Sequence, residues 1–180
     1  MTGPNDLSLG ANVIPDEFRK AVSRFATGIT VITCEDDTGI RGMTCNSFTS
    51  ISLNPATVLV SLKSGKTHRA IRATGRFGVS ILKDEHQSYS AYYSGRANAE
   101  EPPEIAVRGT TPTLRECLAW FECQVIQTVD IHDHTLFVGV VERCGTIDGA
   151  PLMFFESRYH RYTPPPANRL PERKGLEAAA

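Results

Sequence analysis

The chain has 180 residues, of which 41% are hydrophobic and 22% charged, as is typical of a globular protein with a single domain. Its formal net charge of −1 excludes the large basic footprint that nucleic acid or an anionic membrane would attract. No apolar run approaches the roughly 18 residues that span a bilayer. Residues 1–12 lack the basic start and apolar stretch of a signal peptide. We therefore expect no nucleic-acid partner, no membrane partner and no secretion.

The cysteines indicate a reducing compartment. They are odd in number and contain no C-x-x-C pair, which argues against a disulfide framework or a thiolate zinc site. Four of them lie in apolar, strand-like surroundings, where a free cysteine usually serves as a small buried hydrophobe. We therefore predict a cytoplasmic protein with five free cysteines: Cys34, Cys45, Cys117, Cys123 and Cys144.

The first predicted element is a helix. Residues 1–13 are expected to form a flexible leader, after which Pro15 and two acidic residues favour a helix start. Apolar residues then recur at helical spacing, and Gly28 is suited to end the helix. The residues of this apolar stripe are Phe18, Ala21, Val22 and Phe25.

Most of the remaining chain has strand character. Residues 29–33 are β-branched throughout, and the turn at 35–39 predicts that the chain reverses there as a hairpin. Further strands are expected at 57–62, 76–82, 118–129, 135–144 and 152–155. Because the strands come in runs rather than alternating with helices, the pattern predicts an antiparallel sheet or barrel with peripheral helices.

Two short helices and two irregular segments complete the prediction. A helix over 66–74 would be capped by Ser64 and closed by Gly75, and Asp84 would cap a second helix that runs to about Tyr93. Residues 94–113 are expected to form a long irregular excursion. One domain would then span 14–162, followed by an extended or disordered tail at 163–180.

A short basic stretch between a strand and a helix resembles the end of a phosphate-binding P-loop. The complete motif needs a glycine five residues before Gly65, and that position is Val60, so a nucleotide triphosphatase is excluded. Lys66 and Thr67 at a helix start can still hold a phosphate. The alternative is an ordinary helix start with an exposed lysine, and the residues alone leave both interpretations open.

Two histidines, His132 and His134, stand two residues apart, as metal ligands on a strand sometimes do. No third ligand has suitable spacing, and the segment resembles a turn, so we expect no metal site and instead a single histidine directed into a pocket. The chain also lacks the G-x-G-x-x-G fingerprint of a Rossmann fold and the G-x-S-x-G elbow of many hydrolases.

The most unusual stretch of the sequence is rich in small hydroxyl and amide side chains. Such a stretch beside a strand core suggests a wall that hydrogen-bonds a polar, planar ligand. The alternative is a half-exposed strand, whose solvent face is often rich in serine and threonine. The residues concerned are Thr44, Asn46, Ser47, Thr49, Ser50 and Ser52.

With its neighbours, this stretch closely resembles the flavin reductase-like family of short-chain NAD(P)H:flavin oxidoreductases. The likeness covers roughly residues 16–162, and the order and spacing of its motifs are more specific than any one of them. The segments that carry it are Phe25–Thr33, Gly42–Ser52, Asn54–Pro55, Val60–Lys63, Thr67–His68, Gly75–Leu82, Phe121–Cys123, Asp133–Val141, Pro151–Leu152 and Tyr159–His160.

The resemblance implies a split β-barrel that forms a homodimer and holds flavin at or near the subunit interface. It also implies hydride transfer from NADH or NADPH to FMN or FAD, and release of reduced flavin to a partner monooxygenase, by diffusion of the flavin. Two alternatives stay open at this point. One is a non-catalytic flavin- or haem-binding barrel, and the other is a reductase acting on another acceptor, such as a corrinoid or ferric complex.

The resemblance also assigns roles to individual residues. Thr44, Asn46 and Ser47 would contact the isoalloxazine edge, within a wall that includes Cys45 and Ser50, and with Ser61, Leu62 and Lys63 beside it. The flavin phosphate would bind to Ser64, Lys66, Thr67 and His68, and Phe77 would lie along the ribityl or adenine side. His134 would position the nicotinamide without acting as an acid or base, and Tyr159 would close the pocket.

Overall fold

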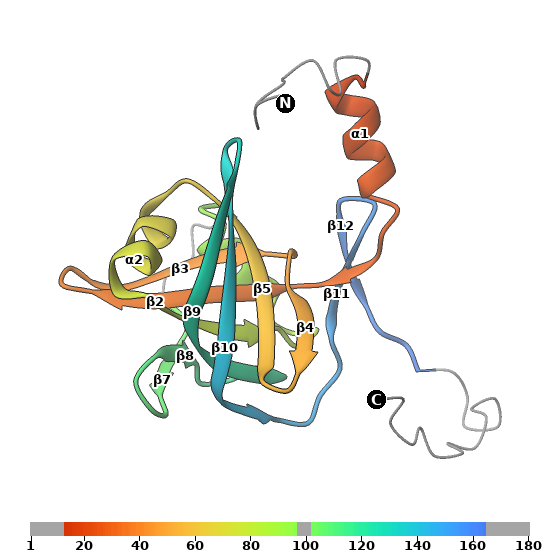
Figure 1. Ribbon diagram of the computed structural model, residues 1–180. Coiled ribbons are helices and arrows are strands. Elements are labelled where there is room, and N and C mark those ends of the chain that lie inside the picture. Colours follow the sequence, from red (N-terminus) through yellow and green to blue (C-terminus); the bar gives the residue numbers. More distant parts are fainter. Residues whose placement is uncertain (1–12, 97–101, 165–180) are drawn as a thin grey trace, which may run out of the picture.

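The computed structural model describes residues 13–96 and 102–164 (Figure 1). The predicted leader therefore lies outside the described residues except for residue 13, and the predicted tail lies outside them except for residues 163 and 164. Within these ranges no helix is long and apolar enough to cross a membrane.

The centre of the fold is a strongly curved antiparallel sheet of seven strands. In Figure 1, β2 and β3 cross the long strands β5, β9 and β10 at a steep angle, so that the sheet folds over on itself. The predicted antiparallel architecture is confirmed. The spatial order of strands is β3 (Gly39–Cys45), β2 (Thr30–Asp36), β6 (Arg76–Ile81), β9 (Ala119–Ile131), β10 (His134–Thr146), β5 (Ala56–Lys63) and β4 (Thr49–Leu53).

Two small sheets flank the main one. The first joins β1 (Thr27–Gly28), β11 (Leu152–Phe155) and β12 (Arg158–Arg161), and the second pairs β7 (Ile105–Val107) with β8 (Pro112–Leu114). The predicted irregular excursion at 94–113 therefore contains a strand and the start of another, and β12 is a strand that the sequence did not predict.

Strand β2 is buried on both faces, which explains its unbroken β-branched sequence. Ile32 and Cys34 face an interior cluster that includes Phe77 and Phe137 and is covered by α2 (Lys66–Thr74), which contributes Ile71. On the opposite face, Val31 packs with Leu82, Leu114 and Leu152 under α3 (Gln87–Tyr93). One strand thus holds two apolar clusters together.

The helix ends differ from the sequence prediction. Helix α1 (Pro15–Val22) stops well before Gly28, because Thr27 and Gly28 pair with β11. The residue at the N-cap of α2 is Gly65 rather than Ser64, and His86 rather than Asp84 precedes α3, with no side-chain cap in either helix. The predicted end of α2 is confirmed: Gly75 has a φ of 69° and donates its amide to the carbonyl of Ile71.

Candidate functional site

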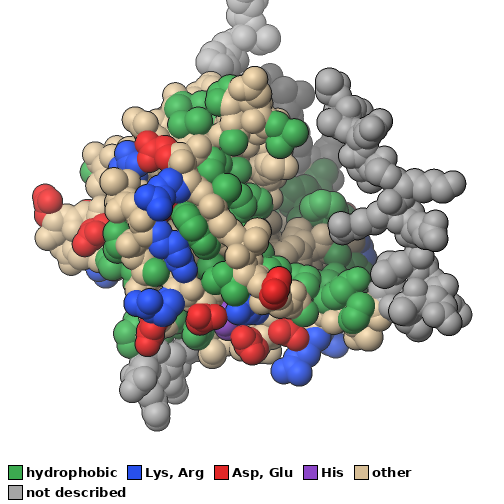
Figure 2. Space-filling model, turned by 90° about the horizontal axis from the view of Figure 1, so that it is seen from below, with side chains coloured by type: hydrophobic (Ala, Val, Ile, Leu, Met, Phe, Trp, Pro, Cys, Tyr) green, Lys and Arg blue, Asp and Glu red, His purple; other side chains and the backbone are tan. Residues whose placement is uncertain are grey.

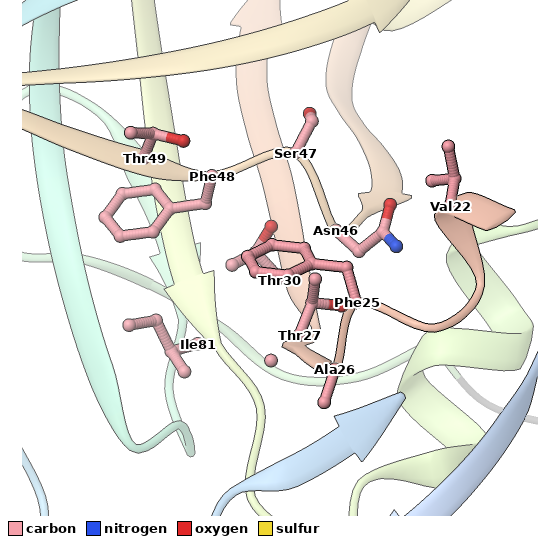
Figure 3. Close-up of a pocket in the computed structure, with 11 residues that line it drawn as sticks. Val22, Phe25, Ala26, Thr27, Thr30, Asn46, Ser47, Phe48, Thr49 and Ile81 are labelled. Carbon is pink, nitrogen blue, oxygen red and sulfur yellow. The ribbon is translucent and has the colours of Figure 1, made fainter. Parts of the chain in front are cut away.

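A cavity of about 580 Å³ opens where the chain passes from β3 to β4, facing the segment that follows α1. Figure 3 shows Phe25 across the middle of this cavity, with Asn46 on one side and Phe48 and Ile81 on the other. Its walls are apolar, and hydroxyl and amide groups lie at their edges. We call this space the strand-edge cavity.

Hydrogen bonds fix the wall that contains Asn46. The hydroxyl of Ser47 donates to the carbonyl oxygen of Ser61 at 2.8 Å and accepts from its amide at 3.0 Å, which ties the β3–β4 turn to β5. On the other side of Asn46, the hydroxyl of Thr30 donates to the carbonyl of Cys45 at 2.9 Å. Asn46 is thus held between two anchored residues, while its own side chain stays exposed at the strand-edge cavity.

The composition of the cavity fits a planar ligand with apolar faces and a polar edge. Phe25 is 76% exposed and offers one aromatic face, and Phe48 packs on Phe121 with ring centroids 5.4 Å apart. Thr27 has a buried hydroxyl oxygen with no hydrogen-bond partner among the described residues. A buried hydroxyl without a partner is destabilising, and a ligand that bonds it would remove that cost. The isoalloxazine ring of a flavin has this combination of properties.

A charged cluster lies at the tip of the β9–β10 hairpin. The carboxylate of Asp133 contacts Nδ1 of His134 at 2.8 Å and Nζ of Lys63 at 3.2 Å, since Lys63 is opposite His134 in the β5–β10 register. Both contacts lower the pKa of Asp133, and the contact with His134 has the larger effect. Asp133 and Asn46 both line a second cavity of about 760 Å³ beside α1, which joins the cluster to the strand-edge cavity.

The start of α2 separates the four predicted phosphate ligands into two groups. Ser64 and Lys66 are exposed, next to the free amides of the first helical turn. Thr67 and His68 are buried, and Nε2 of His68 pairs with the hydroxyl of Thr135 at 2.8 Å. Burial, followed by the charge of Arg72, lowers the pKa of His68. The imidazole of His68 therefore lies inside the barrel and links α2 to β10.

The structure does not bring every predicted residue to the cavity. Leu62 and Phe77 lie in the interior cluster, where Phe77 has no exposed surface. Cys45 packs against the same cluster, and Ser50 is exposed on β4. Thr44 donates to the carbonyl of Ser90 at 2.7 Å, and the hydroxyls of Tyr159 and Ser90 are 2.8 Å apart, so α3 holds both.

Sequence analysis missed three residues of the site: Phe25, Thr27 and Asp133. Phe25 continued the apolar stripe of the predicted helix and was therefore assigned to it. Thr27 follows it directly, and pairing with β11 places its side chain in the cavity wall. Asp133 belonged to an expected turn, and only the strand register shows that its carboxylate reaches Lys63.

The face of the molecule shown in Figure 2 carries charges of both signs. Several lysine and arginine side chains lie together on the left of this view, aspartate and glutamate side chains lie at their margins and along the lower edge, and apolar side chains occupy much of the remaining surface. Charges of both signs on one face weaken any single-sign field that would attract a polyanion.

The fold is an antiparallel split β-barrel, and its strand-edge cavity has a lining suited to a planar ligand. Residues 22–163 match the family described as "Flavin reductase like domain", and the chain belongs to this family.

Comparison with known proteins gives the same family. The chain is 51% identical over 148 residues to the NADH-dependent flavin reductase StyB of Pseudomonas fluorescens, covering 79% of this chain and 87% of that protein. It is 39% identical over 155 residues to an NADH-dependent flavin reductase of Rhodococcus sp, covering 84% of this chain and 88% of that protein.

Solved structures agree. The styrene monooxygenase flavin reductase SMOB of Pseudomonas putida S12 superposes with a TM-score of 0.78 at 51% identity, covering 82% of this chain and 98% of that one. The flavin reductase PheA2 in its native state gives a TM-score of 0.81 at 35% identity, covering 84% of this chain and 100% of that one. The predicted family and fold class are therefore confirmed.

Proposed function

We propose that the protein is an NADH-dependent flavin reductase that supplies reduced flavin to a monooxygenase partner. The observation that carries the proposal is the strand-edge cavity. Its apolar walls, the Thr27 hydroxyl without a hydrogen-bond partner among the described residues and the exposed Asn46 amide suit an isoalloxazine ring. Support comes from relatives of similar length: two are named NADH-dependent flavin reductases, and another, from Rhodococcus opacus, is named as the reductase component of a 4-nitrophenol 4-monooxygenase/4-nitrocatechol 2-monooxygenase.

The residues of the cavity have separate tasks in this proposal. A bound flavin would supply the hydride acceptor and a reduced nicotinamide the hydride, so the two ring systems would carry that chemistry. Phe25 and Phe48 cover the ring and exclude water, while the Asn46 amide and the Thr27 hydroxyl bond its polar edge. Lys66 and the first amides of α2 bind the phosphate, because a helix N-terminus and an ammonium group both favour an anion.

His134 positions the nicotinamide. Its Nδ1 is engaged by Asp133, so Nε2 is left to hydrogen-bond the carboxamide or ribose of NADH. Hydride transfer requires no proton at this position, so His134→Ala should raise the KM for NADH and leave the affinity for flavin unchanged. An unaltered KM and kcat in steady-state assays would contradict this role.

We further propose that the protein acts as a homodimer. Helix α1 buries none of its residues in the single chain, and its apolar side chains Phe18 and Val22 are 62% and 52% exposed. On β4, Ile51 and Leu53 are 54% and 93% exposed. Large exposed apolar groups such as these are typical of a surface that a partner covers.

The expected compartment is the cytoplasm, where NADH and a reduced-flavin monooxygenase are both available. All five cysteines are free, which supports a reducing environment. Reduced flavin would reach the monooxygenase by diffusion.

The deciding experiment is anaerobic. The purified protein is mixed with FMN or FAD, NADH or NADPH is added, and the visible absorbance of the flavin is followed. Rapid bleaching with NADH is expected. Flavin binding without bleaching by either nicotinamide would show that the protein is a flavin-binding barrel and not a reductase.

A further inference from the structure

A separate cavity of about 520 Å³ lies at the β3 edge of the sheet, between the start of α2 and the end of α3. Its volume is in the range of small-molecule sites, which is roughly 300–1,000 Å³. We call it the helix-end cavity. Its walls come from β3 (Ile40, Arg41, Gly42), α2 (Lys66, Thr67), the end of α3 and the residues that follow it (Tyr92, Tyr93, Gly95), the segment before β7 (Pro102, Pro103) and the first residue of β7 (Ile105).

Two aromatic rings form one side of the helix-end cavity. Tyr92 and Tyr93 lie nearly perpendicular, with ring centroids 5.0 Å apart. Tyr93 lies directly against the backbone of Gly42, where any Cβ would come within 2.3 Å of the ring. Burial raises the pKa of Tyr93 to about 12, so its hydroxyl remains a neutral hydrogen-bond donor. Aromatic surface of this kind is suited to stacking a nucleobase.

Two cationic side chains also line the helix-end cavity. Lys66 is exposed at the first position of α2, and Arg41 is half-buried on β3, where its guanidinium also bonds the hydroxyl of Thr38. A single phosphate needs only one cation and the helix amides. A second cation in the same cavity is explained by a second phosphate, since arginine binds phosphate oxygens in a fork geometry.

The helix-end cavity starts at the position proposed for the flavin phosphate, because Lys66 and Thr67 line this cavity. Gly42 in its wall and Asn46 in the strand-edge cavity are separated by four positions along the chain. At about 3.3 Å per strand residue this is roughly 13 Å. A ligand that lies along β3, with its ring beside Asn46 and its phosphate at Lys66, therefore extends into the helix-end cavity only if it continues beyond that phosphate.

FAD continues beyond this phosphate with a second phosphate and an adenosine, whereas FMN ends there. We infer that the helix-end cavity binds the adenosine and outer phosphate of FAD, with the base on Tyr92 and the phosphate on Arg41, and that it makes the protein selective for FAD over FMN. This inference rests on the proposed function for the placement of the flavin.

Equilibrium binding of each oxidised flavin, measured by calorimetry without NADH, tests the inference. The wild-type protein should bind FAD about tenfold more tightly than FMN, a ratio that stacking of one base is sufficient to produce. Tyr92→Ala and Arg41→Gln should each weaken FAD binding by about fivefold to tenfold and leave FMN binding unchanged. Tyr92→Phe, which retains the ring, should bind FAD like the wild type.

Arg69→Gln is the matched control, because Arg69 is an exposed arginine of α2 outside the helix-end cavity. Equal losses for FAD and FMN in the Tyr92 or Arg41 variants, or no loss for either, would overturn the inference. So would an increase in the KM for NADH with both flavin affinities intact, since the cavity would then hold the adenosine of NADH. Because binding is measured without turnover, a protein that selects FAD but does not reduce it would disprove the proposed function alone.

Discussion

At the scale of single residues, Asp133 decides how the charged cluster is arranged. Its carboxylate holds both Lys63 and His134, and no other acidic group contacts either of them within the described residues. These contacts lower the pKa of Asp133, so the carboxylate stays charged throughout the neutral range and loses its charge only in acid.

Removing this charge should disturb the binding of NADH. In Asp133→Asn the amide has nearly the same shape but lacks the negative charge that attracts Lys63 and His134, so we expect the KM for NADH to rise roughly threefold to tenfold. Steady-state kinetics with varied NADH is the measurement, and Asp148→Asn is the control at another exposed turn. A KM equal to that of the wild type would show that the cluster does not orient His134.

His68 should make the stability of the fold depend on pH. Burial, followed by the charge of Arg72, lowers its pKa below the ordinary value of 6.5. At pH values between the lowered pKa of His68 in the folded protein and the ordinary pKa of 6.5, the unfolded chain binds more protons than the folded protein does. The free energy of unfolding is therefore highest above pH 6.5 and falls as the pH drops below that value. His86, whose burial also lowers its pKa, contributes in the same direction.

Urea unfolding at pH values of about 7.5 and 5.5 tests this expectation. Acidification should lower the free energy of unfolding of the wild type, and His68→Gln should be less stable at the higher pH but lose less on acidification. The same loss in both proteins would show that His68 does not cause the dependence.

At the scale of elements, the local sequence predicted those parts that local forces determine. The β-branched run of β2, the turn at Asp36 to Gly39 and the glycine end of α2 each have a local cause, and each lies where it was expected. The early end of α1 was missed because long-range pairing with β11 overrides helical spacing. Likewise β12 exists only through its partner strand, and the sequence carries no separate sign of it.

The candidate site was likewise predictable where its cause is local and not where it depends on distant partners. The run from Thr44 to Ser52 was recognisable as a polar wall because its composition is unusual for a strand. Which of its side chains face a ligand depends on partners distant in the sequence, such as Ser61 for Ser47 and Ser90 for Thr44. Sequence alone could not separate exposed Lys66 from buried His68, since both belong to one short helix.

The end of α2 provides a test at this scale. Gly75 has a left-handed φ of 69°, so Gly75→Ala should destabilise the fold by about 1–2 kcal/mol although the added methyl group meets no neighbour. Gly28→Ala is the matched control, because the space around Gly28 is also open and its φ is not positive. Chemical denaturation measures both variants, and equal effects would exclude the backbone explanation.

At the scale of the whole molecule, the exposed apolar groups of α1 and β4 should control assembly. Leu53→Glu places a charge on the most exposed of them, at 93% accessibility, and should convert the proposed dimer to a monomer in light scattering coupled to gel filtration. Val107→Glu is the control, since Val107 is 57% exposed but lies on β7, in a separate sheet. A dimer that survives Leu53→Glu would show that β4 is not part of the interface.

Phe25 belongs to two surfaces at once, since it lines both the strand-edge cavity and the cavity beside α1. A second copy that covers α1 would therefore restrict the same ring that we propose covers the flavin. Thermodynamic linkage is reciprocal, so flavin should tighten self-association by the same factor by which self-association tightens flavin binding. Dilution would then release flavin and separate the subunits together, and the concentration of the protein would itself set how much flavin it retains.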